Sequence, residues 1–458
     1  MTRRSRRFTD SDSFFTADRR FGPVLGAASF AATQISAGTL VGAIGLHYLT
    51  GIAFVWAWVG IWFGWLLSAV LVAPQLRAYD FVTVPDYFDH RFGAVGVYLR
   101  GLSAVFIGII YLVFTTAQYV AGGLIFEVVF GMDQLLAATL VALVALAYTV
   151  YGGMQTSVYT DAIQLVLLGG GLVVATVVGL GTVGGLSALN TELTAIDPAL
   201  VRPVNAPAQV LGIAVAFGAS IAIAPYEISR VYALRDPDTV RLAVPLSIAI
   251  QAVIAVCIAL LGLIARARFS ALETVDMAVF ELALELFGPV AGGLLLVGVL
   301  AAILSTIDSV LLVTASAIAH DLYAKTLPAL GVFEHPPEQH RVLRVTQGTT
   351  VLAALLPLGL VTVSGVLGEL VQLIIALYAA LLGATLLIPV VASLHLEFIT
   401  AHGALGGMVS GLGGVVLWQA LTLVGSPSPA VTLVHPVFVG VACSGVATVG
   451  VSLLTAGR

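Results

Sequence analysis

The sequence predicts an all-α polytopic membrane protein with about twelve transmembrane helices. Its 458 residues are 59% hydrophobic and only 9% charged, with a mean hydropathy of +1.07, whereas soluble domains carry about 25% charged residues. Apolar runs long enough to cross a bilayer as helices recur along the chain. They lack the alternation over about ten residues that is typical of membrane β-strands. A soluble protein of this length could not cover its surface with so few charges, so that class is excluded.

The predicted spans follow one another with short connections. We expect them at residues 23–44, 51–76, 95–130, 134–152, 156–183, 207–232, 239–265, 288–322, 342–363, 366–393, 403–424 and 434–455. The third and eighth spans are long enough to tilt or to protrude from the bilayer. Before the eighth span, the apolar pattern of residues 273–287 predicts a short amphipathic helix on the outer face.

Basic residues set the expected orientation. With the N-terminus inside, only Arg202, Arg266 and Arg268 of the 19 Lys and Arg lie on the outer side. The other basic residues lie on the cytoplasmic side or at its margin: Arg3, Arg4, Arg6, Arg7, Arg19, Arg20, Arg77, Arg91, Arg100, Arg230, Arg235, Arg241, Lys325, Arg341, Arg344 and Arg458. The positive-inside rule therefore predicts a multi-pass protein of the plasma membrane with both termini in the cytoplasm.

The sequence offers little support for other chemistry. Cys257 and Cys443 lie inside apolar runs, which indicates small buried side chains and not a disulfide framework. No zinc-ligand spacing, phosphate-binding glycine loop or Ser–His–Asp arrangement is present in the sequence. We therefore expect no enzyme activity, no organic cofactor and no nucleic-acid partner. The expected partners are a small-molecule solute and membrane lipid, and the oligomeric state stays open.

Two spans carry polar or helix-breaking residues at mid-membrane depth. The first contains Thr33, Gln34, Ser36 and Thr39 beside two glycines, and the sixth contains Gly218, Ser220 and Pro225, of which the proline cannot donate a backbone hydrogen bond. Each break alone is equally well explained as a packing kink. Interrupted segments at corresponding positions in two halves of a chain point to a transporter binding site. The shift from first to sixth span is odd, so the two halves are expected to be inverted.

The eighth span carries a stripe of polar side chains. Ser305, Asp308, Ser309 and Ser316 share one helix face with Leu312. Facing lipid, these hydroxyls and this carboxylate would lack partners, so the stripe is expected to face other helices, a cavity or an ion. Hydrogen bonding between helices is the alternative explanation.

Four segments together carry a family resemblance. They are FFTADRRFGPVLGAASFAATQISAGTLVGAIG near the N-terminus, DFVTVPDYFDHRFG at 80–93, YGGMQTSVYTDAIQ at 151–164 and AAILSTIDSVLLVTASAIAHDLY at 301–323. In order and spacing they resemble the sodium:solute symporter family from about residue 14 to about 424. The resemblance implies a leucine-transporter-like fold with two inverted five-helix repeats. It divides the chain into a basic N-terminus (1–22), a first repeat (23–183), an outer loop (184–206), a second repeat (207–393) and two further spans (394–458).

The resemblance also implies a Na⁺ site between the first and eighth spans. Its ligands would be the backbone oxygens of Ala32, Ile35 and Ala302 and the hydroxyls of Ser305 and Thr306. Five neutral oxygens form a cage that a monovalent cation can enter and leave. Asp161 matches the acidic residue that the family places near the inward exit of Na⁺, and an interhelical hydrogen-bond acceptor is the alternative. Asp308 is expected either to be structural or to supply charge beside the site, and not to be a direct ligand.

The solute contacts implied by the resemblance come from four spans. On the first span they are Gln34, Ser36, Gly38 and Thr39, and on the sixth they are Phe217, Ile221 and Pro225. Gln118 on the third span and Gln372 on the tenth are further candidates, for which interhelical packing is equally plausible. Proline transporters of the family have an aromatic residue in place of Ile221 and an acid in place of Gln34. Both departures weigh against proline as the solute.

These features predict a secondary active transporter. Na⁺ moving down its gradient would carry a small organic solute, such as an amino acid, sugar or carboxylate, inward by alternating access. The alternative is a transporter-like solute sensor that binds without transport. The sequence leaves the identity of the solute open.

Overall fold

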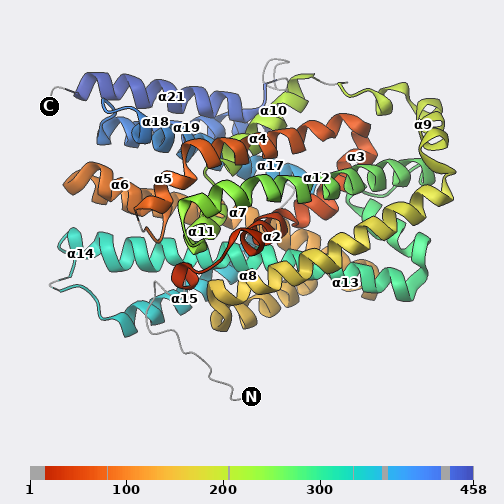
Figure 1. Ribbon diagram of the computed structural model, residues 1–458, viewed down its shortest axis with the longest axis horizontal. Coiled ribbons are helices and arrows are strands. Elements are labelled where there is room, and N and C mark those ends of the chain that lie inside the picture. Colours follow the sequence, from red (N-terminus) through yellow and green to blue (C-terminus); the bar gives the residue numbers. More distant parts are fainter. Residues whose placement is uncertain are drawn as a thin grey trace.

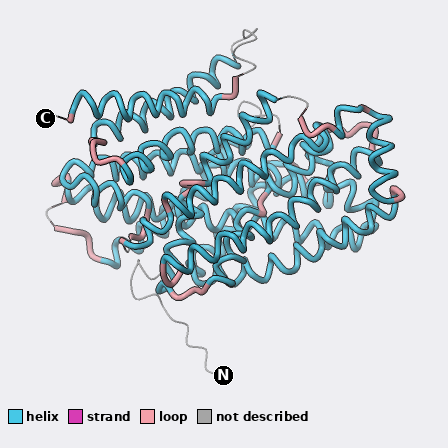
Figure 2. Tube along the Cα trace, turned by 45° about the horizontal axis from the view of Figure 1, so that its top comes forward, coloured by secondary structure: helices cyan, strands magenta, loops and turns pink. Residues whose placement is uncertain are grey.

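The computed structural model describes residues 16–79, 81–204, 207–333, 335–363, 370–423 and 434–456. Helices make up nearly all of this part of the chain, and the long ones run roughly along the longest axis of the molecule (Figures 1 and 2). By length and composition, ten helical stretches of the described residues are able to cross a membrane. The all-α membrane fold predicted from the sequence is thereby confirmed, while the number twelve and the inverted repeat stay predictions.

The elements follow in chain order. The first half contains η1 (Ala17–Arg19), α2 (Pro23–Gln34), η2 (Gly38–Gly42), α3 (Ala43–Thr50), η3 (Gly51–Phe54), α4 (Val55–Leu71), α5 (Ala73–Ala78), α6 (Val84–Phe92), η4 (Gly93–Val95), α7 (Gly96–Phe130), α8 (Gln134–Thr182), α9 (Gly185–Ile196) and η5 (Pro198–Val201). The second half contains α10 (Pro207–Ile221), α11 (Pro225–Ala233), α12 (Pro237–Arg268), η6 (Val275–Met277), α13 (Ala278–Ser316), η7 (Ala317–Thr326), α14 (Leu327–Ala329), α15 (Gln339–Val361), α17 (Val371–Leu382), η8 (Gly383–Leu387), α18 (Ile388–His395), α19 (Ala401–Leu423) and α21 (Pro436–Thr455).

Both predicted breaks are present. The first span is interrupted between α2 and η2, and the sixth between α10 and α11. Pro225 begins α11 as its first residue, where a missing backbone N–H is tolerated. The segment before α2 is joined to the end of α11, because Phe21 N donates to Ala233 O at 3.2 Å and Arg235 N donates to Phe21 O at 3.0 Å. The two broken spans therefore lie together.

Two predicted boundaries differ from the structure. The predicted division between the fourth and fifth spans falls inside α8, which is helical throughout. Glycine is tolerated in membrane helices because no water competes for its backbone hydrogen bonds, so Gly152 and Gly153 do not end this helix. The predicted amphipathic helix at 273–287 is continuous with α13 across a kink at Gly288, whose φ of +70° lies in the left-handed region.

Three arginines that were counted as cytoplasmic charges are buried inside the protein. Arg77 donates to the backbone oxygens of Leu234 and Arg235, Arg100 pairs with Asp86, and Arg230 pairs with Asp161. Since buried and paired arginines report less on membrane orientation than free ones, the inside position of the termini stays a prediction that rests on the remaining basic residues.

The last two long helices pack through a glycine face. Gly403, Gly407 and Gly411 recur every four residues on α19, and a Cβ at any of them would overlap atoms of a neighbouring helix. Such small-residue faces let membrane helices approach closely. Figure 1 shows α19 and α21 together along one side of the bundle.

We expect Gly407→Leu to destabilise the protein by about 1–3 kcal/mol, the usual effect of overpacking, because the added side chain would displace Thr448. Gly413→Leu on the same helix is the control, since nothing lies within 4 Å of a Cβ there. Thermal unfolding in detergent measures both variants. Equal melting temperatures for the two would contradict the packing role of Gly407.

Candidate functional site

Thr306 of α13 lies against the break in the first span. Its buried Oγ1 is 3.5 Å from Ile35 O, 3.4 Å from Thr33 O and 3.3 Å from Ala302 O. Two oxygens that are each about 2.4 Å from a hard cation, at right angles, lie about 3.4 Å apart. The hydroxyl of Thr306 therefore lies at the distance of a neighbouring ligand from each of the three carbonyl oxygens.

Three of the five predicted Na⁺ ligands, Ile35, Ala302 and Thr306, lie together at this break, and the full set of five stays a prediction. Ala32 O accepts a hydrogen bond from Ile35 N at 2.9 Å, which shapes the end of α2. Ser305 Oγ donates to Asp161 Oδ1 at 2.5 Å. Because the hydroxyl hydrogen is held by the carboxylate, the lone pairs of Ser305 Oγ stay available to a cation. Thr33 O is a further oxygen of the group that the sequence did not predict.

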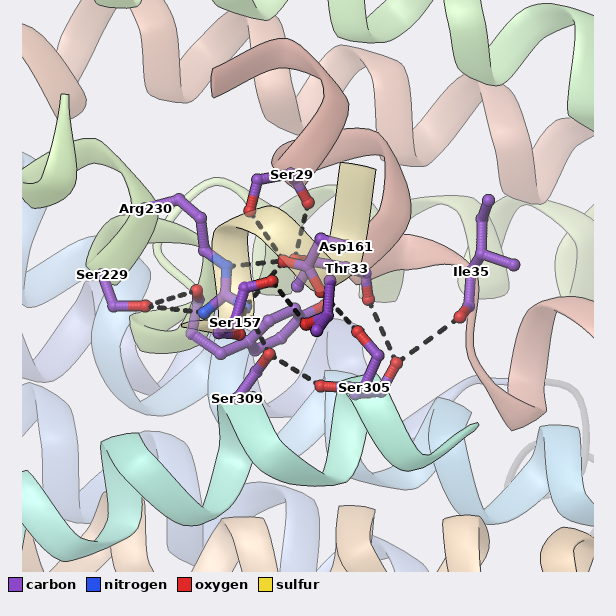
Figure 3. Close-up of polar contacts among 12 residues, drawn as sticks. Ser29, Thr33, Ile35, Ser157, Asp161, Ser229, Arg230, Ser305 and Ser309 are labelled. Atoms are coloured by element: carbon purple, nitrogen blue, oxygen red, sulfur yellow. Dashed lines mark hydrogen bonds and ion pairs between the residues drawn. The ribbon is translucent and has the colours of Figure 1, made fainter. Parts of the chain in front are cut away.

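Asp161 of α8 forms the centre of a buried polar network (Figure 3). Its Oδ2 accepts from Ser29 Oγ of α2 at 2.7 Å and lies 3.2 Å from Arg230 Nη2 of α11. Together with Ser305, these contacts join four helices: α2, α8, α11 and α13. The predicted role of Asp161 at the ion exit stays a prediction, and the structure adds that its carboxylate is paired with an arginine.

All three guanidinium nitrogens of Arg230 donate hydrogen bonds, and Nη1 donates to Ser229 Oγ at 3.3 Å. Nε donates to Thr33 Oγ1 at 3.0 Å, and Nη2 donates to Ser157 Oγ at 3.0 Å and to Ser309 Oγ at 2.5 Å (Figure 3). The side chain of Arg230 is 1% exposed. A buried guanidinium needs both a counter-ion and hydrogen-bond acceptors, and Asp161 with these hydroxyls supplies them. Arg230 was counted from the sequence only as a topological charge.

Asp308 and Ser309, two members of the polar stripe on α13, have separate surroundings. Ser309 contacts Arg230, whereas the buried Asp308 carboxylate faces Thr149 and Ser157 of α8. Asp308 has no hydrogen bond to Thr306 among the described residues, which agrees with its expected structural role. The stripe therefore faces α8 and α11 and not lipid.

A small cavity of about 40 Å³ lies beside the two breaks. Its lining includes seven of the nine candidate solute contacts: Gln34, Ser36, Gly38, Thr39, Phe217, Ile221 and Gln372. A water needs about 10–15 Å³ of such volume. A larger organic solute therefore requires movement of the lining side chains.

Two predicted solute contacts do not line this cavity. Gln118 is turned to the break, where its Oε1 accepts from Ala37 N at 3.0 Å. Pro225 lines a separate cavity of about 20 Å³ with Ser229, Tyr232 and Asp321. The amide of Gln118 is thus used to satisfy unwound backbone, which is the packing alternative weighed for it.

An aromatic wall of the cavity was missed by sequence reasoning. Phe114 of α7 stacks on Tyr226 of α11 and on Tyr378 of α17, with ring centroids 5.8 and 4.3 Å apart. Trp58 and Ser220 are further lining residues that the sequence did not predict. In a chain with 21 Phe and 13 Tyr, aromatic residues on apolar helices are indistinguishable from packing residues before the helices are placed.

A second buried charge cluster joins two of the family-like segments. Arg100 Nη2 is 2.8 Å from Asp86 Oδ1, and Thr83 Oγ1 donates to Asp321 Oδ1 at 2.6 Å. His320 Nε2 lies 3.5 Å from Asp86 Oδ1. The cluster connects α6 and the start of α7 to η7, at the end of the molecule opposite α9 (Figure 1). It therefore fixes the segment between the second and third predicted spans against the end of the eighth.

Known proteins resemble this chain over most of its length. A model of the sodium:solute symporter family matches residues 14–411. The osmoregulated proline transporter OpuE of Bacillus subtilis (strain 168) is 30% identical, over 98% of this chain and 90% of the relative. The high-affinity proline transporter PutP of the same organism is 28% identical, over 90% of this chain and 88% of the relative.

Solved structures share the fold. A Na⁺-coupled sialic acid symporter in a substrate-bound outward-open state has a TM-score of 0.77 at 17% identity, covering 97% of this chain and 92% of that chain. MhsT in complex with L-phenylalanine has a TM-score of 0.55 at 14% identity, covering 96% and 99% of the two chains. The leucine-transporter-like fold predicted from the sequence is thereby confirmed.

Proposed function

Because the chain belongs to the sodium:solute symporter family, we propose that it couples the inward movement of Na⁺ to the uptake of L-proline. The oxygen group around Thr306, beside a cavity lined by both broken spans, is the observation that carries the coupling. The names of its relatives support proline as the solute. Ile221 and Gln34 weighed against proline, and an aromatic wall supplied by other helices offsets the first of these departures.

The proposed mechanism follows from the position of the ion. Na⁺ bound between Thr306 of α13 and the backbone oxygens after α2 would hold the eighth span against the broken first span. This contact stabilises the arrangement in which the solute cavity is formed. Ion and solute then favour the same conformation, and each raises the affinity for the other. Closure on one side and opening on the other would release both to the cytoplasm.

Reconstitution into liposomes tests this proposal. An inward Na⁺ gradient is expected to drive accumulation of radiolabelled L-proline above its equilibrium level, while an equal K⁺ gradient is expected to give none. Collapse of the Na⁺ gradient by an ionophore should release the accumulated proline. Accumulation that is indifferent to Na⁺ would contradict the ion assignment. Na⁺-dependent binding without any accumulation would favour the solute sensor, the second function that the sequence allows.

A further inference from the structure

Glu227 is a buried carboxyl group directly behind the wall of the solute cavity. It lies on α11, next to the cavity-lining Tyr226, and is 2% exposed. One carboxyl oxygen, Oε1, accepts a hydrogen bond from Gln34 Nε2, whereas Oε2 has no hydrogen-bond partner among the described residues. The indole of Trp65 faces the same carboxyl group without a hydrogen bond of good geometry. None of the residues that line the cavity is itself charged.

The positive charge of Arg230, which acts on Glu227 from the same helix, is already paired with another carboxylate. Arg230 lies one turn further along α11, but its ion pair is with Asp161, and its other hydrogen-bond partners are hydroxyl groups. Glu227 has no ion pair among the described residues of the chain. A carboxyl group buried without a counter-ion is costly, and its retention beside a cavity points to a ligand that supplies positive charge.

Glu227 fixes the orientation of the Gln34 amide. Gln34 Nε2 donates to Glu227 Oε1 and, at 2.7 Å, to Tyr226 Oη. An amide nitrogen carries two hydrogens, so both are used. The amide oxygen Oε1 then points the other way, and no donor to it is found among the described residues. Because Gln34 lines the cavity, the atom offered to a solute is a hydrogen-bond acceptor.

The rest of the cavity suits a cation that has an apolar body. Phe114, Tyr226 and Tyr378 form a stacked aromatic wall, and no charged side chain lines the cavity. Aromatic faces attract cations. A solute nitrogen that carries both a positive charge and an N–H can donate to Gln34 Oε1 and also lie against the aromatic faces. A carboxylate solute without such a nitrogen gains neither interaction.

We propose that Glu227 is a positioning residue which, through Gln34, makes this cavity selective for solutes with a protonated amine or imine nitrogen. This inference rests on the proposed transport function. It states which chemical feature of the solute the cavity selects. The selectivity is carried by α11 of the second half of the chain, acting on a residue of α2 in the first half, 193 positions away.

Paired ligands that differ only in the nitrogen test this inference. The pairs are L-proline with cyclopentanecarboxylate, L-alanine with propionate and L-leucine with 4-methylpentanoate. Binding is measured in NaCl by the fluorescence of Trp58, which lines the cavity, and by competition with radiolabelled L-proline. The wild-type protein is expected to bind the nitrogen-bearing member of at least one pair about tenfold or more tightly, the range of a hydrogen bond to a charged group.

The variants separate a positioning role from a general structural one. In Glu227→Gln, the new amide can donate to Gln34 and reverse the orientation of the Gln34 amide. The preference for the nitrogen-bearing ligand of that pair should therefore fall to within about threefold. The change should appear mainly as a raised KM for transport and not as a lowered maximal rate. Glu227→Asp should keep part of the preference. Gln34→Leu should remove it, and adding Glu227→Gln to that variant should change nothing further. Glu192→Gln on the exposed face of α9 is the matched control.

Each outcome decides the inference. Unchanged selectivity in a folded Glu227→Gln protein overturns it, and so does a wild-type protein without preference in any pair. A wild-type preference for an amine other than L-proline, lost in Glu227→Gln, supports the inference while it contradicts proline as the solute. Folding of each variant is checked by its elution profile and by the Na⁺ dependence of its melting temperature.

Discussion

Replacement of Arg230 by methionine is expected to abolish Na⁺-driven solute accumulation and to destabilise the protein by about 3–5 kcal/mol, the usual effect of removing one partner of a buried ion pair. The variant leaves the Asp161 carboxylate, which is fully buried, without its cation, and it leaves Thr33, Ser157 and Ser309 without a donor. The same carboxylate holds Ser305 Oγ, so disorder at Asp161 reaches the proposed ion site directly. Liposome uptake and thermal unfolding measure the two effects.

The double variant Arg230→Met with Asp161→Asn gives a sharper outcome. Removing both charges of a buried pair is far less harmful than removing one, so its melting temperature is expected to recover most of the loss. Transport is not expected to recover, because asparagine has one acceptor oxygen and cannot accept from both Ser29 and Ser305, as the two carboxylate oxygens of Asp161 do. Arg241→Met is the control, since that arginine pairs with Asp238 in an exposed position. Wild-type transport in Arg230→Met would contradict the role assigned to this network.

Thr306→Ala is expected to raise the Na⁺ concentration for half-maximal transport at least about tenfold, the effect seen even when outer groups of a metal site are lost. The substitution removes the hydroxyl that lies within 3.5 Å of the carbonyl oxygens of Ile35, Thr33 and Ala302. Thr306→Ser keeps the hydroxyl and should stay within about threefold of the wild type. Addition of Ser305→Ala to Thr306→Ala should abolish coupling.

Ser316→Ala is the matched control for this pair of hydroxyls. It lies further along the same stripe of α13, and its Oγ bonds to Val313 O of its own helix at 2.9 Å. Uptake is measured as a function of external Na⁺ at fixed solute. Undiminished, Na⁺-dependent accumulation in the Ser305→Ala and Thr306→Ala double variant would show that the ion binds elsewhere.

Local patterns in the sequence were sufficient for the parts of the site that lie on one helix. The spacing of Ser305, Asp308 and Ser309 places them on one face whatever the rest of the fold does, and the structure buries that face. The break at Pro225 follows from proline chemistry alone. The composition, with 9% charged residues, determined that the chain lies in a membrane.

Such patterns could not predict which side chains on different helices become hydrogen-bond partners. Gln34 and Gln118 are both amides at mid-membrane depth, and the sequence treated both as solute contacts, yet one lines the cavity and the other bonds to Ala37 N. The difference depends on the rotation of α7 about its axis. An apolar helix with few charges carries a weak amphipathic signal, so its rotation is set by the sum of many packing contacts.

What the sequence by itself determined was the membrane fold and the family, and the resemblance to that family implied that the proposed ion site lies between the first and eighth spans. The tertiary structure alone decided which buried polar groups are partners. It pairs Arg230 with Asp161 across 69 residues, and it joins Glu227 to Gln34 by a hydrogen bond across 193 residues. The physical reason is the range of the forces involved. Hydropathy and helix periodicity act within a segment, whereas a buried charge is stable only beside a partner that the folded helices bring to it.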